Sequence, residues 1–134
     1  MAVRAIIVDD SETARVEIKY RLGKLGCVVV GEAANAAEGV KLFAELKPEI
    51  VTMDLVMPKE GEIDAMAAIR EIKKQRPNTA VIVISALGSQ EEVATYRAEG
   101  IFDYIVKPVN QFSFDSLQRN LPKRFPELRR PLRM

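Results

Sequence analysis

Short apolar runs rich in β-branched residues recur five times along the chain, and segments with a helical period separate them. The runs cover residues 3–8, 27–30, 49–53, 80–84 and 101–106. Each has the length of a strand, and the first, third and fourth are almost continuously apolar, as in strands covered on both faces of a parallel sheet. The alternation predicts an α/β fold in which right-handed crossovers build a doubly wound, five-stranded parallel sheet with helices on both sides.

The intervening segments carry helix signals. Apolar residues share one face of the first segment at Ala14, Ile18, Leu22 and Leu25. Caps and breaks that mark helix ends are found at Ser11, Gly26, Gly100, Pro48 and Pro77.

Polar residues follow four of the predicted strands, at the edge where such sheets bind ligands. They are Asp9, Asp10, Asp54, Ser85 and Lys107. Three carboxylates without His or Cys favour Mg²⁺ as a bound cation. A carboxylate beside such a cation can attack phosphorus and form an aspartyl phosphate, while the cation and Lys107 neutralise the transferring phosphoryl group.

Composition excludes other chemistries. With no histidine, the chain has no Ser-His-Asp triad, no histidine-ligated zinc and no phosphohistidine of its own. The single cysteine, Cys27, is expected to be a small buried side chain. A net charge of +1 argues against nucleic acid or membrane partners, and no signal peptide or membrane span is visible, so we expect a soluble cytoplasmic protein.

These motifs resemble those of the bacterial two-component response-regulator receiver domain of the chemotaxis-regulator type. The resemblance covers roughly residues 2–121 and rests on four motifs in order: Asp9-Asp10, the segment 51–58 (VTMDLVMP), Ser85-Ala86 and Lys107-Pro108. It implies a flavodoxin-like, three-layer α/β/α fold with strand order 2-1-3-4-5. It also implies a signalling switch that catalyses only its own phosphorylation and dephosphorylation.

The resemblance assigns roles at the phosphorylation site. Asp54 is the phosphoacceptor, and Asp54 and Asp10 bind Mg²⁺ directly, with Mn²⁺ as an alternative. Asp9 holds a metal-bound water, and the backbone carbonyl of Val56 completes the protein ligands. The Lys107 ammonium forms an ion pair with the phosphoryl group.

The resemblance also assigns the switch and the readout. The Ser85 hydroxyl swings toward the phosphoryl group, and the ring of Tyr104 turns inward in response. The signal passes to a protein partner on the face formed by the fourth helix, fifth strand and fifth helix, around residues 93–97, Tyr104 and residues 111–117. The implied phosphoryl donor is a histidine kinase or a phosphotransfer protein, and the chain is a monomer or a phosphorylation-dependent dimer.

Two positions of the family's pattern tune phosphoryl hydrolysis, and here they are the aliphatic Val56 and Leu87. Neither side chain can orient a water molecule, which predicts a long-lived aspartyl phosphate. The pattern also places a glycine where this chain has Glu62, one residue after Gly61.

The C-terminal residues 122–134 form a basic, proline-containing segment that we expect to be an extended tail or a linker stub after the domain of residues 1–121. Pro122 is expected to end the last helix. Among the apolar residues before it, spacing favours Phe112 or Leu117 for the core and leaves another aromatic residue for a partner.

Two alternative functions stay open. An interaction module that is never phosphorylated would keep the fold without the chemistry. A Mg²⁺-dependent phosphohydrolase would also use an aspartate nucleophile, but its Asp-x-Asp motif is absent because Ser11 stands two residues after Asp9.

Overall fold

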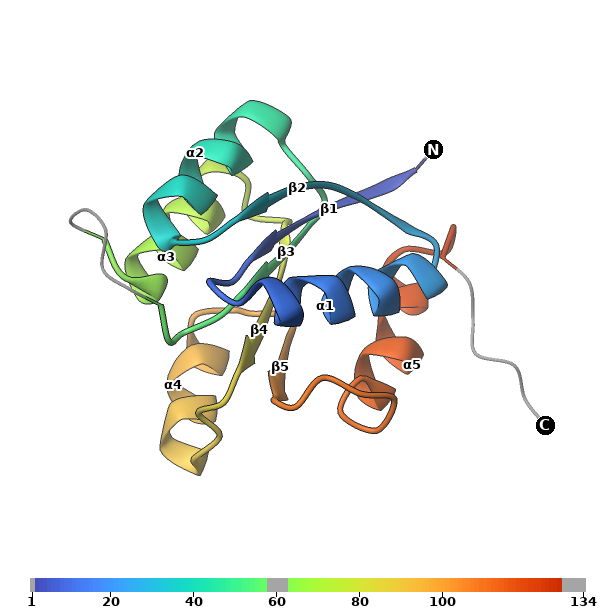
Figure 1. Cartoon of the computed structure of the whole chain (residues 1–134). Coiled ribbons are helices and arrows are strands. Elements are labelled where there is room, and N and C mark those ends of the chain that lie inside the picture. The colour runs from blue at the N-terminus through green and yellow to red at the C-terminus, as the bar shows by residue number, and fades with distance from the viewer. Residues whose placement is uncertain (1, 58–62, 129–134) are drawn as a thin grey trace.

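The computed structural model describes residues 2–57 and 63–128, in which strands and helices alternate (Figure 1). The strands are β1 (Val3–Val8), β2 (Cys27–Ala33), β3 (Ile50–Met53), β4 (Ala80–Ser85) and β5 (Asp103–Val106). The helices are α1 (Glu12–Lys24), α2 (Ala36–Leu46), α3 (Ala65–Gln75), α4 (Gln90–Ala98) and α5 (Asp115–Arg124). None of these helices combines the length and the apolar character needed to cross a bilayer.

The strands form one parallel sheet in the order β2-β1-β3-β4-β5, which confirms the predicted doubly wound architecture. Helices α1 and α5 cover one face, and α2, α3 and α4 cover the other (Figure 1). From β1 the chain first adds β2 on one side and then adds β3, β4 and β5 on the other side, so the order of strands reverses between β1 and β3. The carboxyl ends of these two strands therefore flank the position where ligands bind in such sheets.

The two cores lie on the two faces of the sheet. Strands β3 and β4 are buried along their whole length and β1 nearly so, as their continuous apolar sequences predict. Cys27 is buried at the start of β2, and burial raises the pKa of its thiol to about 12. This confirms that Cys27 is a small apolar core residue.

The edge strand β2 is longer than its apolar run suggests. A register shift opposite Ala5 and Ile6 lets Gly31 and Glu32 continue the pairing with β1 as far as Ala33. The shift is a β-bulge, which sequence periodicity does not reveal because it interrupts the two-residue alternation. With the shift, Glu32 lies opposite Ile7, one step before the carboxyl end of β1.

The expectation that Pro122 ends the last helix is wrong. Helix α5 continues through Pro122 to Arg124, and Phe125 and Leu128 beyond it are buried in the core shared with α1. Proline in a helix costs about 3 kcal/mol, and fully burying an apolar side chain contributes about 1.5–3 kcal/mol, so two such residues offset the proline. Residues 122–128 of the predicted tail thus pack on the body, and residues 129–134 lie outside the described part.

The aromatic residues before α5 also differ from expectation. Phe114 is fully buried and packs with Leu117 and Leu121, whereas Phe112 is 80% exposed. Leu117 is in the core as predicted. Asn110 explains the placement of the two rings, because its side chain accepts hydrogen bonds from the backbone of Phe112 and Ser113 and fixes a turn ahead of the helix.

Candidate functional site

The predicted site residues meet at the carboxyl edge of the sheet. The backbone N–H groups of Asp9, Asp54 and Lys107 each donate a hydrogen bond of 2.8–2.9 Å to a carbonyl of the neighbouring strand. Each residue therefore continues the ladder one step beyond its strand, and its position is set by the sheet. Ser85 is the last residue of β4 and is buried beside them.

Three carboxylates cluster at this edge. One oxygen each of Asp9, Asp10 and Asp54 lies within 4.8 Å of the others, with Asp9 and Asp54 buried and Asp10 exposed. Asp9 Oδ1 accepts a hydrogen bond of 2.9 Å from the Ser11 N–H, and Asp54 Oδ1 accepts one of 3.1 Å from the Val56 N–H. Local backbone turns thus hold the carboxylates of Asp9 and Asp54.

The ammonium group of Lys107 lies between two of these carboxylates. Its Nζ is 2.8 Å from Asp9 Oδ2 and 3.2 Å from Asp54 Oδ2. Burial lowers the pKa of Lys107, but the two carboxylates outweigh burial, so this pKa lies above its ordinary value. Lys107 is therefore charged and poised beside Asp54.

Burial raises the pKa of Asp54, and the Asp9 carboxylate adds to this. The Val56 N–H and Lys107 oppose the shift without cancelling it. A buried carboxylate with a raised pKa gains from any added positive charge. The oxygen-only donor set of Asp9, Asp10 and Asp54 fits the preference of Mg²⁺ for oxygen ligands.

Ser85 and Tyr104 contact the same residue in the loop between β4 and α4. Ser85 Oγ accepts a hydrogen bond of 3.3 Å from the Leu87 N–H, and the Tyr104 hydroxyl donates to the Leu87 carbonyl. Tyr104 is buried, and its ring centroid lies 6.4 Å from that of Tyr96 on α4. Burial raises the pKa of Tyr104. The backbone of Leu87 thus connects the hydroxyl of Ser85 with the ring of Tyr104.

The remaining predicted positions lie around this core of the site. The side chains of Val56 and Leu87 are both exposed at its rim. The predicted role of the Val56 carbonyl as a metal ligand stays a prediction. Gly61 and Glu62 lie outside the described residues.

One contact was not predicted from the sequence. Arg15 on α1 donates a hydrogen bond of 2.7 Å from Nη1 to the backbone carbonyl of Asp9. A cation this close to a helix N-terminus interacts unfavourably with the helix dipole. That position was the one signal in the sequence that Arg15 binds a group outside its own helix.

Comparison with known proteins agrees with the fold and the acidic cluster. The family model of the response regulator receiver domain matches residues 5–117. The chemotaxis protein CheY of Thermotoga maritima is 46% identical over 108 residues, which cover 81% of this chain and 88% of that protein. CheY of Bacillus subtilis is 43% identical with the same coverage.

Solved structures give the same result. CheY in the CheX-CheY-BeF3-Mg²⁺ complex from Borrelia burgdorferi superposes with a TM-score of 0.78 at 30% identity, covering 91% of this chain and 88% of that chain. The response regulator domain of Thermotoga maritima CheB superposes with a TM-score of 0.72 at 31% identity, covering 92% and 93%. The chain belongs to the response regulator receiver domain family.

Proposed function

We propose that this chain is a phosphorylation-activated signalling switch whose phosphoryl acceptor is Asp54. The observation that carries the proposal is the position of Lys107 Nζ, 3.2 Å from a carboxylate oxygen of Asp54 and 2.8 Å from one of Asp9. An ammonium group there neutralises charge on a phosphoryl group bonded to Asp54. Asp54 is also the member of the acidic cluster that Lys107 contacts at the end of the central strand β3.

In the reaction, a carboxylate oxygen of Asp54 forms a bond to the phosphorus of the donor. The bond between phosphorus and the leaving atom breaks, and its electron pair stays on that atom, which takes up a proton. A histidine kinase or a phosphotransfer protein is the proposed donor, because this chain has no histidine to carry the phosphoryl group itself. We place this exchange in the cytoplasm.

Mg²⁺ is the proposed cofactor, with Mn²⁺ as an alternative. Asp10 and Asp54 would hold the ion directly, Asp9 through water, and the Val56 carbonyl would complete the protein ligands. When bound, the ion supplies positive charge that stabilises the transferring phosphoryl oxygens. The three clustered carboxylates favour binding, because an added cation relieves their mutual repulsion.

The proposed switch acts through Leu87. Ser85 Oγ accepts from the Leu87 N–H, so its own hydrogen is available to a phosphoryl oxygen, and rotation toward that oxygen releases the Leu87 N–H. The Leu87 carbonyl then adjusts together with the Tyr104 hydroxyl that it accepts from. Phosphorylation thereby changes the balance between two arrangements of the loop, as differential contacts require.

A protein partner is proposed for the face formed by α4, β5 and α5. Large apolar side chains are exposed on it or at its edge: Leu87, Val106 and Phe112. Exposed apolar groups of this kind favour docking of a protein over nucleic acid. The same proposal covers the oligomeric state. The chain acts as a monomer or as a phosphorylation-dependent dimer, because a second copy of the chain is one protein partner that this face suits.

The test is the intact mass of the protein after incubation with Mg²⁺ and acetyl phosphate. We expect addition of a single phosphoryl group, which Asp54→Asn and a chelator each abolish. No addition by a protein that binds Mg²⁺ would favour the interaction module that is never phosphorylated. Continued turnover of a phosphomonoester in excess would instead favour a phosphohydrolase.

A further inference from the structure

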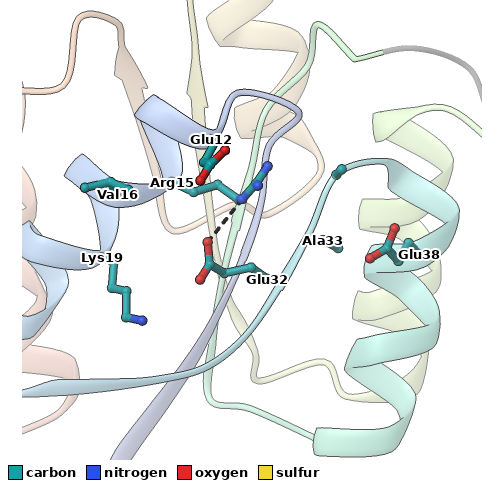
Figure 2. A pocket seen from close by; sticks show the side chains of 8 residues that line it. Glu12, Arg15, Val16, Lys19, Glu32, Ala33 and Glu38 are labelled. Atoms are coloured by element: carbon teal, nitrogen blue, oxygen red, sulfur yellow. Dashed lines mark hydrogen bonds and ion pairs between the residues drawn. The ribbon is translucent and has the colours of Figure 1, made fainter.

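We propose that Arg15 is a positioning residue that holds the Asp9–Asp10 peptide in the orientation needed to bind a divalent cation. The inference rests on the proposed function and deepens it. Arg15 lies in the wall of a pocket of about 390 Å³ between α1, β2 and the start of α2, where its side chain points toward Glu32 (Figure 2).

The guanidinium group of Arg15 connects two segments. Its Nη1 donates to the Asp9 carbonyl at 2.7 Å, and its Nε donates to Glu32 Oε1 at 3.1 Å. Because the guanidinium is rigid and planar, fixing Nε on Glu32 also fixes the direction of Nη1. Strand β2 thus anchors the arginine that holds the loop between β1 and α1.

This contact completes the restraints on Asp9. Its N–H donates to the Ala33 carbonyl, its Oδ1 accepts from Ser11, and its Oδ2 faces Lys107. The carbonyl is the remaining polar atom, and Arg15 binds it. The N–H, the carbonyl and Oδ1 of this acidic residue are therefore hydrogen-bonded, and its buried Oδ2 is held by the ion pair with Lys107 alone.

The same carbonyl belongs to the planar peptide that carries the N–H of Asp10. Within residues 2–57 and 63–128, no hydrogen bond or ion pair holds the carboxylate of Asp10, which is exposed. The backbone consequently sets the direction of the Asp10 Cα–Cβ bond, from which the carboxylate reaches the cluster, and Arg15 holds the carbonyl of the preceding peptide. Glu32 balances the charge of Arg15, so the role we infer is orientation and not attraction of the acidic cluster.

Helix α1 offers a matched control. Arg21 pairs with Glu17 through Nε and Oε1 at 3.1 Å, as Arg15 pairs with Glu32. The side chains of Arg15 and Glu32 are 19% and 37% exposed, and those of Arg21 and Glu17 are 16% and 40% exposed. Arg15 pairs across to β2 and also binds the Asp9 carbonyl, whereas Arg21 pairs within α1 and lies over the Tyr20 ring, away from the acidic cluster. The comparison therefore separates contact with the acidic loop from general stabilisation of the helix.

The experiment compares the full chain with Arg15→Met, Arg15→Lys and Arg21→Met by Mg²⁺ titration calorimetry and by amide NMR of the metal-free protein. We expect both Arg15 variants to weaken Mg²⁺ binding by about tenfold, in the range known for residues that orient metal ligands. Arg15→Lys keeps the charge but lacks the planar fork. Arg21→Met should leave the affinity within about twofold of the parent, because it alters no group near the acidic cluster.

In the metal-free spectra, the Arg15 variants should shift the amide signals of Asp10 and Ser11, and Arg21→Met should not. Unchanged affinity and unchanged amide signals in Arg15→Met would overturn the proposal, as would an equal loss of affinity in Arg21→Met. A parent protein that binds no Mg²⁺ would instead refute the proposed function together with the cation-binding role, and the amide signals would then decide whether Arg15 orients the peptide.

Discussion

Substitution of Gly88 tests how closely the loop between β4 and α4 must approach β5. A Cβ atom at Gly88 would lie 2.8 Å from Cγ2 and 3.0 Å from Cγ1 of Val106, but 3.5 Å from its Cβ. The backbone of Gly88 does not have the positive φ of Gly26 and Gly100, so alanine is opposed there by the clash alone. Val106 is β-branched and cannot easily turn its methyl groups away.

Two terms set the expected effect of Gly88→Ala. Overpacking costs about 1–3 kcal/mol. Loss of glycine's freedom in the unfolded chain offsets about 0.4–1 kcal/mol of this. Val106→Ala alone should cost about 1 kcal/mol, because its side chain is partly exposed and loses two methyl groups. The double variant removes the clashing atoms and keeps an ordinary contact, so we expect a favourable coupling energy of about 1–3 kcal/mol.

The four proteins of this cycle can be compared by urea unfolding, with a constant slope as the check for two-state behaviour. Gly88→Ala should also displace the carbonyl of Leu87, and NMR of the Tyr104 ring should report the weakened hydrogen bond to it. The tyrosine signal should return in the double variant. Zero coupling between Gly88 and Val106, or an unmoved Tyr104 signal in a destabilised Gly88→Ala protein, would refute the reasoning.

Other variants test the core and the site. Phe114→Ala should lower the free energy of unfolding by about 3–5 kcal/mol because the ring is fully buried, whereas Phe112→Ala should change it by less than about 0.5 kcal/mol; equal losses in urea unfolding would contradict this assignment. Asp54→Asn should stabilise the metal-free protein at neutral pH. Burial raises the pKa of Asp54 above the ordinary value of 3.8, so the folded state binds this proton more tightly, and stability falls as pH rises through that window. The Tm difference between variant and parent should therefore shrink in acid, and a difference independent of pH would rule out this cause. Val56→Asn should shorten the lifetime of the aspartyl phosphate severalfold, because an amide can orient water; intact mass over time measures it, and an unchanged lifetime would show that the aliphatic side chain is not the reason.

The sheet was predictable because its signal is local. Strands β3 and β4 are buried along their whole length and β1 is buried except at Arg4, so almost all of their residues are apolar. The bulge in β2 and the continuation of α5 past Pro122 depend on distant partners instead. Whether the helix continues past Pro122 depends on the free energy gained when Phe125 and Leu128 are buried in the core. No sequence pattern within the helix reports that gain.

Phe112 and Phe114 show the same limit of prediction from sequence, at the turn before α5. Both precede the helix, where the 3.6-residue period does not yet apply. The hydrogen bonds from the backbone of Phe112 and Ser113 to Asn110 determine which ring points inward. Helical spacing therefore indicated Leu117 correctly and gave no valid basis for choosing Phe112.

The grouping of Asp9, Asp54 and Lys107 was predictable because strand ends in a parallel sheet meet at one edge. Their hydrogen-bond partners were not. Arg15 binds a backbone carbonyl, and Leu87 contacts Ser85 and Tyr104 through its own backbone, so neither set of contacts depends on a side-chain pattern that a motif records.

The charges of the site support the proposed role of a hydroxyl in the switch. Three carboxylates and the Lys107 ammonium carry a formal charge of −2, which a divalent cation would neutralise. A phosphoryl group on Asp54 replaces one negative charge with nearly two, so a neutral site becomes negative again. Its oxygens then need donors that carry no further negative charge, and Ser85 is buried beside them with a hydrogen to donate. In the proposed switch, that hydrogen bond would draw Ser85 away from the Leu87 N–H, and the hydrogen bond from the Tyr104 hydroxyl to the Leu87 carbonyl would connect the chemistry at Asp54 to the position of Tyr104.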